Sequence, residues 1–487
     1  MTAHRRNDET DRSGLTYLLP SPGGAVWLGL GPAGLAGLAV TTSATVLLLL
    51  TGAPLLYAAA VTTAGATLSC LRVAGRTVLQ WTPRAGAHLR AHAGGAARWT
   101  LPLPQLTAPG SAPVALSLLP ESGPVRLCTA ASRAGGAEEL AVLSNHGGRR
   151  TVLLDIVGTG RFGLLDPHEQ DGHIAGWGNN LAALLATPGL LAATWLTHTR
   201  PHSTSCTTAL ARDRTDSNDE LAADYLRLKQ NVIAEASRHR HLLALTFTRT
   251  ARRNPAGGDG DLLELARQVA TRLLADDLLA RPLSPGDVPP LLALMLDPSR
   301  DDDPGDHSTR TAALVGSRRN NWTFCTTDDT VHRSFAITGW PRTALSADWL
   351  TPLLHHAPPS GSAHTFTVQA RPVAPDHAAR RARAASAKAR LDNADRQRLG
   401  FTPAAHSDLD QLDADATEAE LVAGYRMADV TALMTLHAPS LPVLDAATRD
   451  LRALAVALRL DLRPLHGQHA TALAATLPTG VVPGTHG

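Results

Sequence analysis

Several residue patterns that mark catalytic or metal sites are missing from this sequence. Only two lysines occur, Lys229 and Lys388, and neither follows a glycine. The phosphate-binding pattern G-x-x-x-x-G-K-[ST] is therefore absent, which excludes an ordinary nucleotide-driven motor. The four cysteines are scattered and form no C-x-x-C pair, so the sequence predicts neither a structural zinc site nor a disulfide framework.

The composition nevertheless predicts a folded protein. Hydrophobic residues make up 44% of the chain and charged residues 18%, which is enough apolar material to form a core. A chain of 487 residues exceeds what one core usually organises, so we expect two domains. The net charge of +2 gives no general attraction to nucleic acid.

Charged residues are absent between Arg12 and Arg72, and this gap predicts a membrane segment. The gap far exceeds the roughly 20 residues of one transmembrane helix, so we expect two helices, near residues 30–50 and 55–71, separated at residues 51–54. Arginines flank both ends, which predicts an inner-membrane protein with both termini in the cytoplasm. A signal peptide would be much shorter; a hairpin buried in a core is the remaining alternative.

The rest of the sequence alternates between strand and helix patterns. The Asn145-His146-Gly147-Gly148 run predicts a hairpin, and Asp166-Pro167 predicts the start of a helix. We expect strands at residues 139–144, 151–157, 190–197, 242–248, 331–340, 365–372, 427–437 and 460–465. We expect helices at residues 166–185, 219–238, 261–279, 346–356, 375–399, 406–425 and 443–458.

This alternation predicts an α+β fold, in which a transmembrane helical hairpin precedes two ferredoxin-like α/β domains. A long helical hairpin at about residues 375–425 is inserted in the second domain. The expected segments are a cytoplasmic N-terminal tail (1–27), the transmembrane hairpin (28–72), a basic, proline-rich connector (73–115), a first α/β domain (116–296), a linker (297–310) and a second α/β domain (311–487).

Two motifs resemble known sites but fail in their spacing. Residues 158–163 match G-x-G-x-x-G, yet the capping signal Asp166-Pro167 lies beyond the last glycine, so no helix N-terminus would face a dinucleotide. His168 and His173 are five residues apart, whereas two zinc ligands on one helix face are four apart. We interpret the first motif as a flexible loop and the histidines as solvated residues.

The remaining candidates also favour structural interpretations. Five arginines on or beside a predicted helix could contact phosphate or anionic lipid, but a solvated helix face is the more common explanation: Arg371, Arg380, Arg381, Arg383 and Arg390. His355-His356 ends a predicted helix, where positive charge is mildly favourable. No G-x-S-x-G pattern occurs. We therefore predict no catalytic, cofactor-binding or metal-binding residues, although a triad of distant residues stays open.

Short motifs in a fixed order resemble an actinobacterial family of two-helix integral membrane proteins encoded with conjugation and type IV secretion ATPases. The motifs are Gly163-Leu164-Leu165, Glu169-Gln170-Asp171 before Trp177-Gly178, Phe335-x-Ile337-x-x-Trp340-Pro341, Trp349-Leu350-x-Pro352-Leu353-Leu354, Leu399-Gly400-Phe401, the run 418–425, Leu465-x-Gly467-Gln468 and Leu477-Pro478-x-Gly480. The family joins a small inner-membrane subunit to the non-catalytic N-terminal part of a VirB-type ATPase. The layout is also similar to EccE of type VII secretion.

The resemblance implies a non-enzymatic inner-membrane subunit, without cofactor, that docks a separate VirB-type ATPase to a membrane channel. Its expected partners are that ATPase, other channel subunits and the lipid bilayer, within a homo- or hetero-oligomeric assembly; nucleic-acid contact is disfavoured. An EccE-like component of type VII secretion is the alternative, and a membrane-anchored enzyme is a third possibility. An enzyme would require a deep pocket with converging polar side chains.

Overall fold

A computed structural model gives the fold of the chain. It describes residues 2–4, 16–18, 32–52, 54–73, 76–101, 114–116, 118–131, 139–145, 148–158, 161–201, 237–248, 259–299, 314–341, 345–356, 361–398 and 405–482. The helix expected at residues 219–238 lies almost wholly outside the described residues, and so does most of the 297–310 linker.

Most of the predicted helices form within a few residues of their expected bounds. The α-helices are α1 (Pro32–Leu50), α2 (Leu55–Cys70), α3 (Val78–Ala93), α4 (Pro167–Leu185), α7 (Asp259–Leu274), α8 (Val288–Leu296), α9 (Thr351–Leu354), α10 (Pro375–Arg398), α11 (Ala405–Val422), α12 (Leu441–Ala457) and α13 (His469–Thr476). Two 3-10 turns, η2 (Pro120–Ser122) and η3 (Phe162–Leu164), complete the helical elements of the described residues.

The strands cover most of the predicted ones and add several more. In the first half they are β1 (Thr2–His4), β2 (Thr16–Leu18), β3 (Arg72–Val73), β4 (Arg76–Thr77), β5 (Arg98–Thr100), β6 (Val114–Leu116), β7 (Val125–Ala131), β8 (Glu139–Ser144), β9 (Arg150–Gly158), β10 (Leu190–Pro201), β11 (Ser237–Phe247) and β12 (Leu278–Pro282). In the second half they are β13 (Ser317–Asn320), β14 (Cys325–Thr327), β15 (Thr330–Gly339), β16 (Ala363–Pro372), β17 (Ala428–Ala438) and β18 (Asp461–Pro464).

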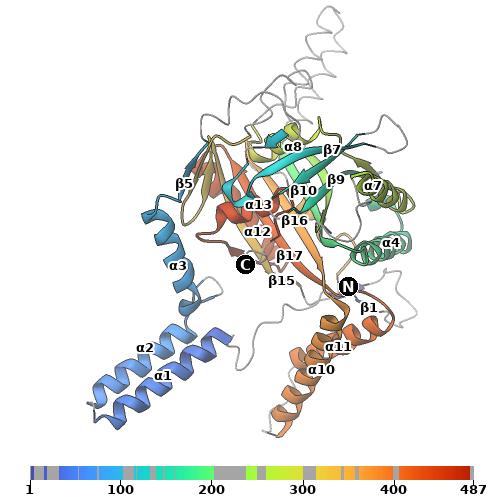
Figure 1. Ribbon diagram of the computed structural model, residues 1–487. Helices are drawn as coiled ribbons and strands as arrows, with labels where there is room; N and C mark the ends of the chain where they lie inside the picture. The colour runs from blue at the N-terminus through green and yellow to red at the C-terminus, as the bar shows by residue number, and fades with distance from the viewer. Residues whose placement is uncertain are drawn as a thin grey trace, which may run out of the picture.

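One antiparallel sheet of 14 strands organises the body (Figure 1). Its order is β5-β13-β14-β15-β17-β16-β10-β11-β9-β8-β7-β6, with β12 beside β9 and β18 beside β15. The two halves of the chain meet where β10 pairs with β16, in the register Trp195↔Val368. Because this pairing is continuous, hydrogen bonds cross the middle of the sheet without a break.

The two halves repeat one connection pattern. In the first, β9, α4, β10, β11, α7 and β12 follow in sequence, and the strands lie in the order β12-β9-β11-β10. In the second, β15, α9, β16, β17, α12 and β18 give the order β18-β15-β17-β16, with α10 and α11 inserted between β16 and β17. The helix that follows the first strand, α4 in the first half and α9 in the second, therefore has an equivalent position in the two repeats.

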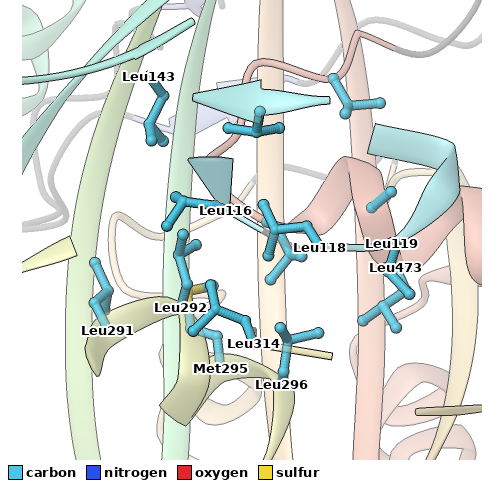
Figure 2. Packing of buried hydrophobic residues seen from close by; sticks show 14 of the residues in the cluster. Leu116, Leu118, Leu119, Leu143, Leu291, Leu292, Met295, Leu296, Leu314 and Leu473 are labelled. Carbon is cyan, nitrogen blue, oxygen red and sulfur yellow. The ribbon is translucent and has the colours of Figure 1, made fainter. Parts of the chain in front are cut away.

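Helices cover both faces of the sheet, as alternation along the strands requires. One face packs against α8, α13 and the segment around Leu118, and Figure 2 shows their leucines gathered over the strands. The opposite face packs against α4 and α7 in the first half and against α9 and α12 in the second. Phe335 on β15 is fully buried on this second face.

The predicted fold class, with two separate ferredoxin-like domains, is wrong. The strands form a single continuous sheet, because β10 bonds to β16, and strands outside the two repeats extend it at both edges. The chain is therefore not a membrane hairpin followed by two ferredoxin-like domains. The inserted helical pair at about residues 375–425 does form, as α10 and α11.

The predicted transmembrane hairpin at residues 28–72 is also wrong. Its two helices exist, but within the described residues no helix combines the length and the apolar character that crossing a bilayer requires. The turn at Thr51 and Gly52 divides the uncharged segment, leaving 16 residues in α2, or about 24 Å of helix against a hydrocarbon layer of about 30 Å. The inner-membrane location, which rested on this hairpin, is overturned with it.

Candidate functional site

The α1–α2 hairpin stands away from the sheet (Figure 1). Many of its large apolar side chains are exposed. The two helices meet through the hydroxyls of Thr45 and Thr62, which are 2.9 Å apart. On the outer sides, Leu50 is 78% exposed and Leu56 is 83% exposed. We call the following residues the hairpin surface: Val40, Val46, Leu47, Leu49, Leu50, Leu55, Leu56, Tyr57 and Leu68. Large apolar side chains exposed together on two adjacent helices are typical of interaction sites.

Helix α3 connects this hairpin to the body through an aromatic cluster. The ring of Trp322 lies 5.8 Å from that of Trp81 and 5.1 Å from that of His88, both on α3. On its other side Trp322 stacks on His466 at 6.0 Å, with 7° between the ring planes. Arg318 then donates to the carbonyls of residues 96 and 97, just beyond α3. The hairpin surface is thus fixed to the sheet by packing as well as by chain connection.

The α10–α11 pair uses its arginines in internal ion pairs. Arg390 lies 3.3 Å from Asp415 on α11, and Arg381 lies 2.7 Å from Asp429 on β17. Arg371 on β16 also contacts Asp429, at 3.5 Å. Three of the five arginines singled out in the sequence therefore contact neighbouring carboxylates, which agrees with a structural interpretation of the run.

The glycine motif and the two histidines lie around the start of α4. Strand β9 ends at Gly158, and α4 begins only after Asp166, which caps the backbone N–H groups of His168 and Glu169 at 2.9 Å. Among the described residues of this region, a short 3-10 turn, η3, begins at Phe162 inside the motif, and the α-helix begins only at Pro167. His168 is exposed as predicted, but His173 is half-buried and lines a cavity.

That cavity, of about 470 Å³, lies between α4 and the face of the sheet where β10 meets β16. Its walls are almost entirely apolar. Trp177 of α4 and Trp195 of β10 meet edge to face, with ring centroids 4.9 Å apart. Phe366 and Val368 of β16 add to the floor, and Phe162 of η3 lies at the edge, 37% exposed. A mostly apolar cavity of this size is typical of small-molecule sites.

The cavity exists because the two repeats differ in one helix. Helix α4 has 19 residues, whereas its equivalent α9 has four. The sequence explains the difference, because Pro358-Pro359 follows His355-His356, and two consecutive prolines cannot continue a helix. The short α9 reaches the cavity only through Leu350, at its N-cap, and Leu354.

Besides the indole N–H donors of Trp177 and Trp195, four polar side chains line the cavity, and two of them are aspartates that lie together in the turn from α7 to β12. His173 Nδ1 lies 3.3 Å from the carbonyl oxygen of Asp276. Because a carbonyl only accepts, Nδ1 carries the proton, and Nε2 of a neutral His173 is an acceptor. Asn180 donates to the Asp276 carboxylate, and Asp277 has a left-handed φ of 60°. On the sheet, Thr197 Oγ1 lies 3.1 Å from His241 Nδ1.

On the opposite face of the sheet, a buried chain of polar side chains crosses five strands. We call it the histidine track. Thr327 contacts His332 Nε2, whose Nδ1 lies 2.9 Å from Nδ1 of His437. Thr365 Oγ1 then lies 2.9 Å from both His437 Nε2 and His198 Nδ1. A neutral imidazole has one donor and one acceptor nitrogen, so within His332 and His437 the direction of one hydrogen bond sets that of the next, whereas the Thr365 hydroxyl can accept from both of its neighbours.

Burial keeps these imidazoles neutral. It lowers the pKa of His332 to about 3, and it lowers that of His198 to about 3 with help from Arg200 and Arg240. Burial and the neighbouring histidines hold the pKa of His437 well below its ordinary value. Neutral rings suit this position because an unpaired charge in the core would be costly.

Neither the cavity nor the histidine track was predicted from the sequence. The cavity depends on a helix that is missing from one repeat, which no local pattern reveals. The track left a weak signal, because His and Thr recur at alternate positions in β16 and β17, whose buried sides would ordinarily be apolar.

Metal and thiol chemistry find little support in the described part of the chain. It contains no group of three or more His, Cys, Asp or Glu side chains that could hold a metal ion. Burial raises the pKa of the Cys325 thiol far above its ordinary value, which leaves the thiol unreactive. Comparison of the sequence with protein-family models found no matching family, and comparison with curated proteins found no match.

Proposed function

We propose that this chain is a non-enzymatic assembly subunit of a type IV secretion or conjugation-like apparatus. In this role it docks a separate VirB-type ATPase to the other subunits of the channel. The observation that carries the proposal is the hairpin surface, a group of large apolar side chains on two helices that stand away from the body (Figure 1). The sequence motifs that resemble proteins encoded with such ATPases supply the identity of the partner.

The hairpin surface suits docking on energetic grounds. Burying one exposed leucine or valine stabilises a complex by roughly 1.5–3 kcal/mol, before the cost of association. A stable interface needs on the order of 1,000 Å² or more of buried surface, which several such side chains in one patch can supply. The aromatic cluster between α3 and Trp322 would hold the docked partner at a fixed place beside the sheet.

The missing phosphate-binding loop agrees with this division of labour. A subunit that lacks G-x-x-x-x-G-K-[ST] needs a separate motor if the assembly is to use nucleotide energy. The proposed subunit contributes buried surface and position, and it turns over no substrate.

Affinity purification of the full-length chain from its native host tests the proposal. The wild-type chain should recover a VirB-type ATPase, and the double variant Leu47→Ser/Leu56→Ser should lose it. Leu391→Ser/Leu412→Ser is the matched control, because these leucines are also exposed on a helical pair, α10–α11. Recovery of a tandem-ATPase translocase would favour the type VII alternative. Repeated recovery of the chain alone would contradict both assignments.

A further inference from the structure

We propose that the cavity between α4 and the sheet binds a small molecule with an aromatic or alicyclic body and a protonated amine. Helices α1 and α2 contribute no residue to its lining, so this site is separate from the hairpin surface. The proposal follows from the size of the cavity, the aromatic character of its walls and the kind of polar group at its rim.

The size argues that the cavity is a site and not a packing defect. Protein interiors are close-packed, with few voids larger than a water molecule. A cavity of about 470 Å³ falls instead in the range of small-molecule sites. It also lies over the joint between the two repeats, where side chains of β10 and β16 form one wall together and Val368 of β16 is only partly buried.

The walls favour a flat or compact apolar body. The edge-to-face arrangement of Trp177 and Trp195, at 71° between the ring planes, presents two indole surfaces to the cavity. Phe162 and Phe366 add two more rings to the lining. The face of an aromatic ring attracts a cation and also packs against apolar groups. These walls therefore suit an organic cation.

The rim favours a positive head group that donates hydrogen bonds. Asp276 and Asp277 bring two carboxylates to one side of the cavity, and Nε2 of a neutral His173 is a further acceptor there. No lysine or arginine occurs among the described residues that line the cavity. An anion such as a carboxylate or a dinucleotide would therefore meet acceptors and negative charge without a matching cation.

Three ligands of nearly equal size test the charge preference: 1-(aminomethyl)naphthalene, 1-naphthalenemethanol and 1-naphthoate. Isothermal titration calorimetry with the full-length chain should show that the amine binds at least tenfold more tightly than the carboxylate, with the alcohol between them. Equal affinities for the amine and the carboxylate, or no detectable binding of the amine at millimolar concentration, would overturn the proposal.

Two variants test the location of the site. Asp277→Asn keeps a residue type that tolerates the left-handed backbone and should weaken amine binding about tenfold, while binding of the alcohol stays unchanged. Asp328→Asn is the matched control, because Asp328 also has a positive φ but does not line the cavity. Trp177→Ala should weaken all three ligands together. Amine affinity that neither Asp277→Asn nor Trp177→Ala changes would place the ligand elsewhere and refute the assignment.

Discussion

Acid should destabilise this fold steeply, because histidines are buried in their neutral form. The pKa of four of them is lowered to about 3, with burial as the main cause: His198, His332, His364 and His469. In the unfolded chain each has an ordinary pKa near 6.5. As the pH falls below 6.5, the unfolded state takes up protons that the folded state does not, so the stability present above that pH is progressively lost.

The size of the effect follows from the unfolded chain, where the four sites are far apart and titrate independently. Between pH 7.5 and 5.5 each histidine lowers the free energy of unfolding by about 1.4 kcal/mol, and the four together lower it by about 5.5 kcal/mol. Near pH 5.5 the slope approaches about 5 kcal/mol per pH unit. Since small domains unfold with about 5–15 kcal/mol in total, a change of this size should be obvious.

Urea unfolding at 25 °C, followed at half-unit pH steps from 7.5 to 5.5, measures this slope. His364→Gln should reduce the slope near pH 5.5 by about 1 kcal/mol per pH unit, because one buried imidazole is removed. His168→Asn, at an exposed position on α4, should leave it unchanged. A free energy of unfolding that varies by less than about 1 kcal/mol over this pH range would refute the reasoning, since the imidazoles would then not be buried and neutral as described.

Three further changes should alter stability by different routes. Asp166→Ala removes the cap at the start of α4 and should lower the free energy of unfolding by about 1 kcal/mol in chemical denaturation; no change would mean that the cap contributes nothing. Gly480→Ala should cost more than about 1 kcal/mol, because φ is +74° and an added methyl group would collide with the Thr151 hydroxyl; a neutral result in the same assay would contradict that geometry. Phe335→Ala should cost about 3–5 kcal/mol by leaving a cavity on the α12 side of the sheet, and a melting temperature equal to that of the wild type would show that the site is not packed as described.

The sequence predicted the elements that carry a clear period or a capping signal. Two apolar runs joined by the Asn145-His146-Gly147-Gly148 turn signal identified β8 and β9, and Asp166-Pro167 identified the start of α4 to the residue. In contrast, α8 and α13 were missed because almost every side chain in them is buried, so neither has the amphipathic period that distinguishes a surface helix.

Other errors came from context that no local pattern contains. Strand β12 was taken for the end of α7, because its short apolar run continues the helical pattern past Leu274. The expected helix at residues 346–356 shrank to α9, and the cavity follows from that loss. The membrane prediction placed the two helices and the turn between them correctly, but it inferred bilayer crossing from the lack of charge alone, and within the described residues neither α1 nor α2 combines the length and apolar character of a span.

Binding between purified proteins tests the docking proposal most directly. If the proposal holds, the full-length chain and a VirB-type ATPase from the same organism should form a complex in analytical ultracentrifugation, with a Kd in the micromolar range or tighter. Leu47→Ser/Leu56→Ser should weaken that complex at least tenfold, while Leu391→Ser/Leu412→Ser should leave it intact. Equal affinity for all three forms of the chain, or no complex at all, would contradict the proposal that the hairpin surface docks the motor.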